Sequence, residues 1–302
     1  MNVLVAGGTG FIGSHLCAEL DDRGHDVTAL ARHPDGNDLP EGVETAVGDV
    51  TAYDSIEGHF EGQDAVVNLV ALSPLFKPKG GREMHHRVHE GGTEHCVRAA
   101  EAHDVSRFVQ LSGVMADPNA DTAYLRAKGR AEDHVRESNL DWVILRPTIV
   151  FGDGDEFEDF VTMLTTPVVT GLPGGGRVKY QPMFVGDLVP IIAAAIEDDE
   201  HIGETYELGG PERLSLAEVT RMVYSARGSK TRIMPVPTAL ARVGLKVLDP
   251  VPFFPLGADQ AKSMDVDLVV EPNQVAAFGL EEKDMTTYAE YLGVNRTTPA
   301  YS

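Results

Sequence analysis

Met1-Asn-Val-Leu-Val-Ala-Gly-Gly-Thr-Gly-Phe-Ile-Gly13 opens the chain, and this stretch predicts a strand, a turn and a helix. An apolar run, Val3 to Ala6, breaks into a glycine-rich turn, after which apolar residues recur at helical spacing. Gly7, Gly10 and Gly13 stand in a G-x-x-G-x-x-G arrangement. A glycine triplet alone also fits an ordinary tight turn, so its context has to decide between the two interpretations.

The context favours a dinucleotide-binding corner. The first glycine of such a corner allows a tight reversal, the second lets the backbone approach a pyrophosphate, and the third lets the helix lie close on the strand. Free N–H groups and a partial positive charge at the helix N-terminus attract the phosphates. The residues expected to contact the dinucleotide here are Gly7, Thr9, Gly10, Phe11, Ile12 and Gly13.

The chain continues as an alternation of strands and helices, which predicts an α/β fold of the Rossmann type: a doubly wound parallel sheet with a small C-terminal substrate lobe. Residues 1–150 are expected to form the nucleotide-binding domain, completed by about residues 180–210, and residues 151–179 and 211–302 the substrate lobe. The predicted strands after the first are His25–Leu30, Glu44–Val47, Ala65–Val70, Phe108–Leu111, Trp142–Leu145 and Thr205–Leu208, and the main predicted helices are Thr51–Phe60, Glu83–His103, Val185–Glu197, Leu216–Ala226 and Thr238–Leu248.

The composition is strongly acidic: 47 acidic and 25 basic residues give a formal net charge of −22 over 302 residues. Such a surface repels nucleic acid, so no nucleic-acid partner is expected. We hypothesise a salt-rich cytoplasm, where screening relieves the self-repulsion.

Cys17 and Cys96 form neither a metal spacing nor a disulfide framework, which favours a reducing compartment. The first strand begins at residue 2, leaving no room for a signal peptide, and the expected location is cytoplasmic.

The second strand ends in Ala31-Arg32-His33, where an NAD-selective fold would place an acidic residue on the ribose. Arg32 could instead pair with a 2′-phosphate, so NADP(H) is favoured over NAD(H); an exposed loop arginine is the alternative. Asp49, followed by Val50, could accept a hydrogen bond from the adenine amino group or cap the next helix. Ala71 and Pro147, each at the end of a strand, are further expected cofactor contacts.

Three residues could carry chemistry. Ser112 follows the fifth strand at the carboxyl edge of the sheet, and Tyr124 and Lys128 stand four residues apart, which places them on one helix face. Lys128 could hold the nicotinamide ribose and lower the pKa of Tyr124, which would exchange a proton with substrate while Ser112 hydrogen-bonds the same oxygen. A Tyr-x-x-x-Lys pair alone is more often solvated, but its order after the glycine corner and Ser112 favours catalysis.

With these motifs, the sequence resembles the short-chain dehydrogenase/reductase superfamily, in its extended or atypical branch of NAD(P)-dependent epimerase/dehydratase-like proteins. Within that branch it is most similar to relatives of the nucleotide-binding accessory subunit of mitochondrial complex I, through Val88–Gly91, Leu145–Asp155 and Gly209–Glu212. The residues that carry the superfamily resemblance are Gly7–Gly13, Gly48-Asp49, Ser112, Tyr124, Lys128, Leu145–Pro147, Phe151-Gly152, Phe184–Asp187 and Tyr206–Gly210.

The resemblance implies NADP(H) binding by the first domain, with Ser112, Tyr124 and Lys128 in the positions of the family's catalytic trio. His89 departs from the pattern, because many relatives carry there an asparagine that supports a proton relay. Two functions are therefore expected as alternatives. One is an oxidoreductase or epimerase on a small substrate such as a nucleotide sugar, isoprenoid or quinone-like molecule. The other is a redox-inactive, NADP(H)-holding accessory or assembly protein that docks peripherally on a membrane respiratory complex.

Other features leave alternatives open. His85 and His89 have the spacing of a metal pair, but no third ligand stands near, so solvated helix histidines are favoured and no metal is expected. Arg146 could reach the cofactor or substrate, or form a structural ion pair. The Gly174–Arg177 loop could wrap an anionic substrate, although a plain loop is favoured. Val251–Pro255, with the helix before it, could rest on a membrane or partner, whereas closing the substrate cleft is preferred.

Overall fold

The computed structural model describes residues 1–34, 39–240 and 266–294. These residues form two compact units. The first unit contains residues 1–72, 78–147 and 185–207, and the second contains residues 73–77, 148–184 and the described residues from 208 onward. No helix among the described residues is long and apolar enough to span a membrane.

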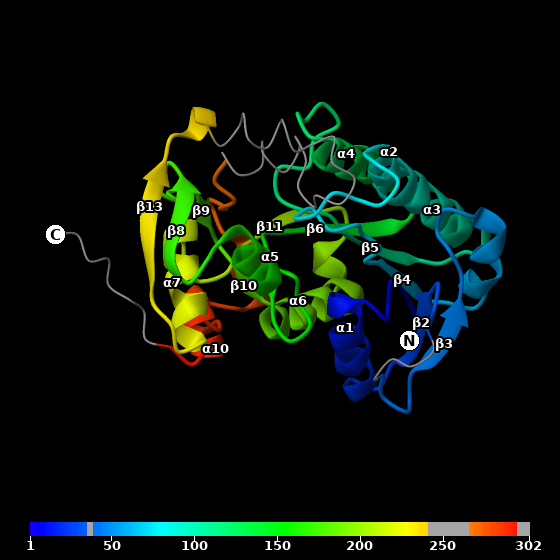
Figure 1. Ribbon diagram of the computed structural model, residues 1–302. Coiled ribbons are helices and arrows are strands. Elements are labelled where there is room, and N and C mark those ends of the chain that lie inside the picture. The colour runs from blue at the N-terminus through cyan, green and yellow to red at the C-terminus, as the bar shows by residue number, and fades with distance from the viewer. Residues whose placement is uncertain (35–38, 241–265, 295–302) are drawn as a thin grey trace. The chain divides into compact units, whose positions relative to one another are not determined.

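A seven-stranded sheet organises the first unit (Figure 1). Its spatial order is β11-β6-β5-β4-β1-β2-β3, and strands β1 to β6 pair in parallel with their neighbours. The chain moves outward from β1 to β3 and then returns to β4 on the other side of β1, so the sheet is doubly wound, as predicted. The strands are β1 (Asn2–Ala6), β2 (Asp26–Ala31), β3 (Glu44–Val47), β4 (Ala65–Asn68), β5 (Arg107–Leu111), β6 (Asp141–Pro147) and β11 (Thr205–Leu208).

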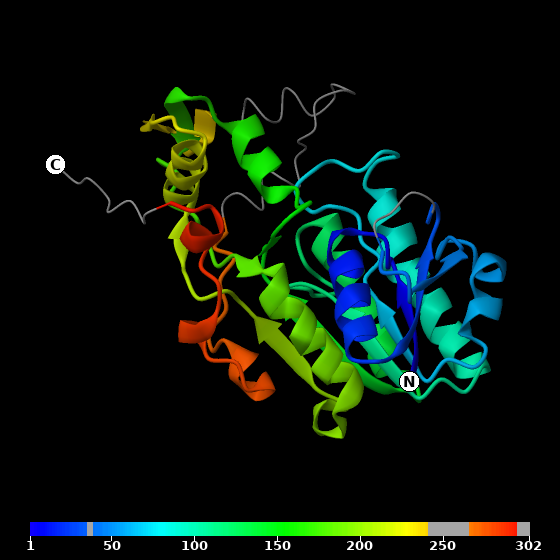
Figure 2. The ribbon, with the colours of Figure 1, turned by 90° about the horizontal axis from the view of Figure 1, so that it is seen from below.

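Helices cover both faces of this sheet. Helices α1 (Phe11–Asp22) and α6 (Val185–Glu197) lie on one face, and α3 (Gly92–Ala102) and α4 (Ala123–Arg136) on the other (Figures 1 and 2). The central strands β1, β4 and β5 are buried on both faces over most of their length, so their sequences are mainly apolar rather than alternating. The edge strands β3 and β11 contain exposed or half-buried polar residues. Helix α6 and strands β3 and β11 have the limits predicted from the sequence.

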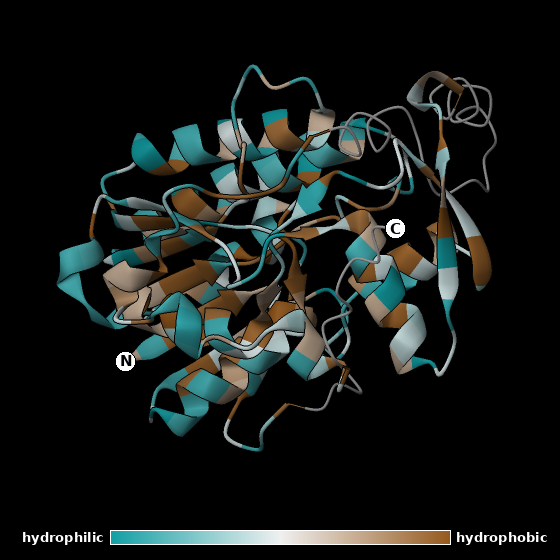
Figure 3. Ribbon diagram, turned by 90° about the vertical axis from the view of Figure 1, so that its left-hand side faces the viewer, coloured by the Kyte–Doolittle hydropathy of each residue, from teal (hydrophilic) through white to brown (hydrophobic). Residues whose placement is uncertain are grey.

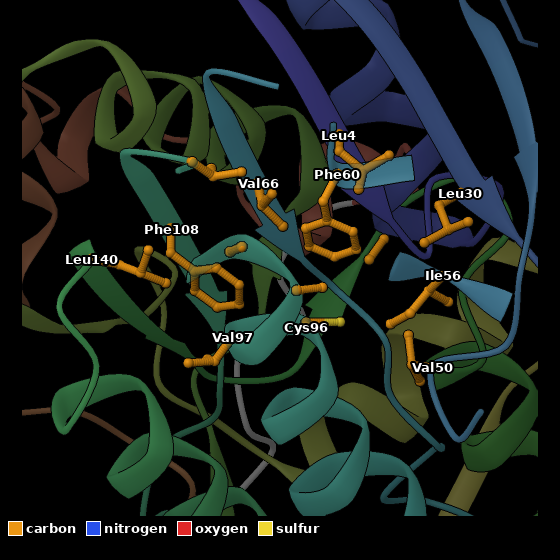
Figure 4. Close-up of a cluster of buried hydrophobic side chains, with 14 of the residues drawn as sticks. Leu4, Leu30, Val50, Ile56, Phe60, Val66, Cys96, Val97, Phe108 and Leu140 are labelled. Atoms are coloured by element: carbon orange, nitrogen blue, oxygen red, sulfur yellow. The ribbon is translucent and has the colours of Figure 1, made fainter. Parts of the chain in front are cut away.

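One hydrophobic core of the first unit lies between the sheet and the helices α3 and α4. Ile144 is completely buried there. So are Phe60 and Phe108, which Figure 4 shows together with the buried Leu4 and Leu30 from the strands near the glycine corner. Each such side chain contributes about 1.5–3 kcal/mol by leaving water. Figure 3 shows the corresponding pattern, with apolar strands between helices whose outer faces are hydrophilic.

Two predicted helices have a different form. In place of Thr51–Phe60 the chain makes two short 3-10 helices, Tyr53–Ser55 and Glu57–Phe60. The predicted helix Glu83–His103 is a composite: α2 (Glu83–His85), the π-helix η3 (His86–Gly91) and α3. A π-turn inserts one extra residue into a helix, so it shifts which side chains share a face.

The second unit is built from short strand pairs and two longer helices. Strands β7 and β10 pair in parallel, as do β8 and β13, whereas β9 and β12 are antiparallel. A core around Phe151, Phe157, Tyr180 and Tyr288 joins these elements. Their limits are β7 (Val150–Phe151), α5 (Phe157–Leu164), β8 (Val168–Pro173), β9 (Lys179–Tyr180), β10 (Met183–Phe184), β12 (Leu214–Ser215), α7 (Leu216–Ala226), β13 (Thr231–Val236) and α10 (Tyr288–Tyr291). The second unit also contains 3-10 helices at Gln274–Phe278 and Glu282–Asp284, and the first unit contains one at Asp199–His201.

A capping box fixes the start of α7: the Ser215 hydroxyl accepts from the Glu218 N–H, and the Glu218 carboxylate accepts from the Ser215 N–H. Helix α7 has the limits predicted from the sequence. The predicted segments Thr238–Leu248 and Val251–Pro255 lie, beyond residue 240, outside the described residues.

Candidate nucleotide-binding and catalytic site

The glycine corner after β1 is shaped to receive a phosphate group. Gly7 has a φ of +84°, which favours glycine, and its N–H donates to the Leu30 carbonyl over 2.8 Å. A Cβ on Gly13 would lie 2.2 Å from the Gly7 carbonyl oxygen, so only glycine lets α1 approach this closely. The N-cap of α1 is Gly10, which provides no side-chain cap. The first-turn N–H groups and the glycine cradle therefore fit a pyrophosphate.

The corner lies at the point where the sheet reverses its winding, between β1 and β4. In open α/β sheets, ligands bind outside the carboxyl ends of the strands at this point. Because β1 to β6 are parallel, the residues that end or follow these strands share one edge of the sheet. Those predicted as site residues are Gly7, Arg32, Asp49, Ala71, Ser112 and Pro147.

Asp49 has a local role in the structure. Its Oδ1 accepts hydrogen bonds from the Thr51 N–H at 2.9 Å and from the Thr51 hydroxyl at 2.8 Å, so it closes a turn before the 3-10 helices and does not cap an α-helix. Partial burial tends to raise the pKa of this carboxyl, but these hydrogen bonds and the charges of Arg32 and Arg87 outweigh it and lower the pKa. Asp49 is therefore ionised at neutral pH.

Ser112, Tyr124 and Lys128 gather around the end of β5. The Lys128 Nζ donates to the Leu111 carbonyl oxygen over 2.8 Å, and the Tyr124 hydroxyl lies 3.5 Å from the position a Cβ would take on Gly113. The Ser112 N–H donates to Leu145 of β6 over 2.7 Å, while its buried hydroxyl has no hydrogen-bond partner among the described residues. The Lys128 ammonium group and the Tyr124 hydroxyl thus contact the residues on either side of Ser112 at the end of β5.

Burial dominates the acid–base properties of this group. It raises the pKa of Tyr124 to about 12. It also lowers the pKa of Lys128 to about 8, although the charge of Glu132 acts in the opposite direction. The shift for Tyr124 is opposite to the direction expected from the sequence. The physical reason is that loss of water disfavours the phenolate more than the ammonium group stabilises it.

Two histidines from the helix before α3 contact Tyr124. The rings of His85 and His89 stack with centroids 5.5 Å apart, and both meet the Tyr124 ring edge-on, at 5.6 Å and 5.2 Å. His85 and His89 are 2% and 1% exposed, so they are not the solvated helix histidines that the sequence favoured. Their burial could not be predicted from the sequence, because the π-helix that follows His85 and contains His89 has no periodic signature.

His89 also holds the loop after β4. Its Nε2 accepts the Leu72 N–H over 3.3 Å. Burial, followed by the charges of Lys128 and His85, lowers the pKa of His89 well below its usual value, so the ring is neutral. With Nε2 acting as an acceptor, the proton is on Nδ1, a buried atom that has no partner among the described residues. Because the His89 Nε2 accepts the Leu72 N–H, this nitrogen is not available as a metal ligand.

Arg146 forms an ion pair, one of the two alternatives left open by the sequence. Its Nε and Nη2 donate to the two oxygens of Glu132 over 2.9 Å and 2.6 Å, and Nη1 lies 3.5 Å from Glu207. Glu132 is completely buried and also accepts from Arg136. Sequence reasoning missed Glu132, whose position one turn after Lys128 on the same helix face was the available signal. Gly174–Arg177 lies between β8 and β9 of the second unit.

A doubly wound sheet with a glycine corner at its reversal point defines a dinucleotide-binding protein. The chain belongs to the NAD(P)H-binding family, whose model matches residues 7–171. The predicted family and fold are thereby confirmed.

Relatives with different roles match most of the chain. The mitochondrial NADH-ubiquinone oxidoreductase 40 kDa subunit of Neurospora crassa is 29% identical over 84% of this chain and 67% of its own length. The 3 beta-hydroxysteroid dehydrogenase/Delta 5→4-isomerase of Mycobacterium tuberculosis is 28% identical over 76% of this chain and 70% of its own. Among solved structures, Thermus thermophilus UDP-glucose 4-epimerase with NAD has a TM-score of 0.71 at 22% identity, covering 97% of this chain and 96% of that one.

Proposed function

We propose that this protein is an NADP(H)-dependent oxidoreductase in which Ser112, Tyr124 and Lys128 act on an oxygen of a small substrate. The observation that carries the proposal is the convergence of these three side chains at the end of β5, on the same sheet edge as the glycine corner. The Ser112 hydroxyl supports it further, since it has no partner in the described part of the chain and a buried hydroxyl without one is costly unless a ligand supplies it.

The three residues have separate tasks in this proposal. When bound, the nicotinamide supplies the hydride transfer. Tyr124 gives a proton to the developing alkoxide in the reductive direction, or takes one from the substrate hydroxyl in the oxidative direction. Ser112 donates a hydrogen bond to the same oxygen and so orients it. Lys128, fixed by the Leu111 carbonyl, holds a positive charge that favours the tyrosinate and can bind the nicotinamide ribose.

The same residues could serve an epimerase, in which the oxidised substrate is reduced again before release. The fold similarity to UDP-glucose 4-epimerase makes a nucleotide sugar one candidate substrate class, and the similarity to a hydroxysteroid dehydrogenase supports an apolar alcohol or ketone of the isoprenoid or quinone-like class. The second unit supplies the substrate lobe in this proposal.

NADP(H) is proposed over NAD(H) because the residue after β2 is Arg32, an exposed cation, rather than an acidic residue. A carboxylate at this position would bind the ribose hydroxyl of NAD and repel a 2′-phosphate. A guanidinium instead pairs with phosphate through two parallel hydrogen bonds.

The test begins with identification of the nucleotide that copurifies, by mass spectrometry of the denatured protein. Bound NADPH should then be oxidised by a suitable carbonyl substrate from a metabolite pool. Tyr124→Phe keeps the ring but removes the exchangeable proton, and it should lower the rate by about 10²- to 10⁴-fold while the nucleotide still binds. Tyr53→Phe, which removes a hydroxyl outside the site, is the matched control and should retain full activity. Equal activity of both variants would overturn the assignment of Tyr124.

A second candidate function is a redox-inactive, NADP(H)-holding accessory or assembly protein of a membrane respiratory complex. It is supported by the similarity to the 40 kDa subunit of NADH-ubiquinone oxidoreductase and by the raised pKa of Tyr124 under two packed histidines. In that case the protein retains its nucleotide without turnover against any carbonyl pool, and pull-down from detergent-solubilised membranes recovers respiratory subunits. Substrate-dependent oxidation of the bound nucleotide would exclude it.

A further inference from the structure

Strands β8 and β13 form a two-stranded parallel ribbon in the second unit (Figure 1). On one face of the ribbon, Leu172 and Ile233 pack on the core of this unit. On the other face, the register places Val169 beside Arg232, with Met234 two residues further along β13, and these three residues are exposed. Side chains alternate along a strand, so the ribbon has one buried face and one face in solvent, which we call the open face.

The open face and its surroundings are rich in aliphatic side chains. Val169 and Met234 are 50% and 45% exposed, while Val168 before them and Leu240 after β13 are 73% and 64% exposed. These four are nearly half of the nine large hydrophobic residues that are exposed within the described part of the chain. Single exposed apolar residues are ordinary in a soluble protein, whereas a group of them marks an interaction surface.

Val168 is exposed through an unusual backbone conformation. Alternation along β8 would place it with Thr170, which is buried, but its φ is +74°, in the left-handed region that β-branched residues rarely adopt. Its N–H donates to the Lys230 carbonyl over 3.1 Å, which fixes this start of the strand on β13. Backbone strain of this kind clusters at functional positions, so the exposure of Val168 supports a role for this end of the ribbon.

The ribbon is basic, although the chain as a whole is acidic. Residues 219–248, which include β13, contain six basic residues and no acidic residue, and residues 160–176, which include β8, contain no charged residue. Lys230 and Arg232 are exposed here, and neither forms an ion pair with a residue of the described ranges. Both stretches thus bring positive charge and no carboxylate to the ribbon, in a chain whose formal net charge is −22.

We propose that the open face of β8 and β13 docks on the surface of an anionic lipid bilayer. Val168, Val169 and Met234 enter the boundary between the headgroups and the acyl chains, and Lys230 and Arg232 lie among the lipid phosphates. Aliphatic side chains flanked by cations, with no carboxylate between them, match both layers of such a surface. This docking does not depend on the nucleotide or on the reaction proposed for the first unit.

A second copy of the chain fits the ribbon less well. The Lys230 and Val236 carbonyls accept hydrogen bonds from β8 and the residue after it, so Pro235 stands on the other edge of β13 and offers no N–H to a neighbouring strand. Face-to-face contact between two open faces would bring Lys230 and Arg232 of both copies into one apolar interface. Neither ribbon contains a carboxylate to neutralise them, so this contact would bury unpaired charge.

The acidic net charge of the whole chain does not prevent contact with an anionic bilayer. At physiological ionic strength the Debye length is about 8 Å, so exposed carboxylates farther than this from the bilayer are largely screened. A lysine or arginine near the surface acts within the same short range. The composition of the ribbon, rather than the net charge of −22, therefore decides whether the contact is attractive.

The experiment measures cosedimentation of the full-length protein with vesicles of phosphatidylcholine alone and of phosphatidylcholine mixed with an equal amount of phosphatidylglycerol. We expect binding to the anionic vesicles only. The double variant Lys230→Gln and Arg232→Gln should weaken this binding about tenfold or more, because each cation near an anionic surface contributes attraction. Val169→Ser should weaken it about fivefold, because less apolar area leaves water.

Matched controls remove similar groups away from the ribbon. The double variant Arg213→Gln and Lys283→Gln removes two exposed cations elsewhere in the second unit, and Val47→Ser removes an exposed valine of β3. Both should bind the anionic vesicles as the wild type does. All substitutions are at exposed positions, so the melting temperatures should stay close to that of the wild type, which separates lost docking from unfolding.

Three results would overturn the inference. The first is a wild-type protein that does not sediment with anionic vesicles, and the second is equal binding of the wild type and the variant that lacks Lys230 and Arg232. The third is a wild-type dimer in sedimentation velocity that Val169→Ser dissociates, since a second copy would then cover the open face. None of these results bears on nucleotide binding, so the proposed function is tested separately.

Discussion

His89 combines burial, a fixed tautomer and contact with the proposed catalytic phenol. Its neutral ring accepts the Leu72 N–H and packs edge-on against Tyr124. An asparagine at this position could accept the same N–H through its side-chain oxygen but would leave Tyr124 without the ring contact. The residue therefore acts here as a positioning residue for the loop after β4 and for Tyr124.

The first prediction concerns the pH dependence that His89 imposes. Because its pKa in the folded protein is well below the unfolded value of about 6.5, the unfolded chain binds the extra proton as the pH falls below that value. The free energy of unfolding should therefore decrease below pH 6.5, by at most about 1.4 kcal/mol per pH unit from this group. In His89→Asn, urea unfolding between pH 7.5 and 5 should show a shallower decrease.

His86→Asn is the control for this prediction, because His86 is an exposed histidine of the same π-helix. It should not make the decrease shallower. If the free energy of unfolding fell equally with pH in wild type and in His89→Asn, the prediction would be wrong. Protonation of His89 would then cost the folded protein nothing.

At the scale of elements, a buried ion pair joins α4 to β6. Glu132 is completely buried and binds Arg146 through both oxygens, while its charge also acts on Lys128 one turn earlier. The pair fixes the helix that carries Tyr124 and Lys128 against the strand next to Ser112. A buried carboxylate of this kind is costly to disrupt, because its partner is left without a counter-charge.

The second prediction is that Glu132→Gln destabilises the protein by about 3 kcal/mol, measured by urea unfolding. It should also move the pKa of Lys128 further below about 8, since the opposing charge is lost. Glu158→Gln, which breaks the exposed pair with Arg227, is the matched control and should cost at most about 1 kcal/mol. Equal costs for the two substitutions would contradict a structural role for the buried pair.

Much of this architecture could be predicted from the sequence because it depends on local signals. Continuous apolar runs identified the buried strands, and period-3.6 patterns located α6 and α7 to the residue. The π-turn could not be predicted, since one inserted residue changes hydrogen bonding without changing the apolar pattern. The ring contacts of His85 depend on how separate elements pack, so no sequence spacing encodes them. The Arg146–Glu132 pair also joins two elements, and its only sequence signal was the position of Glu132 one turn after Lys128.

For the whole molecule, net charge is the dominant global property. A formal charge of −22 on 302 residues destabilises the compact state through self-repulsion. The arginine pairs described above relieve this only locally. Most of the repulsion acts between exposed carboxylates, and it is therefore open to screening by dissolved salt.

The third prediction follows from that screening. The Debye length falls from about 10 Å at 0.1 M to about 3 Å at 1 M salt, so the melting temperature should rise steeply over this range of KCl. Sucrose, which stabilises proteins by exclusion from their surface without screening charge, is the control and should produce a smaller and more gradual rise. Because screening reaches most of its effect below 1 M, the curve should flatten above that concentration. Equal melting temperatures at 0.05 M and 1 M KCl would mean that the carboxylates are spaced too widely to repel, and the hypothesis of a salt-rich cytoplasm would lose its physical basis.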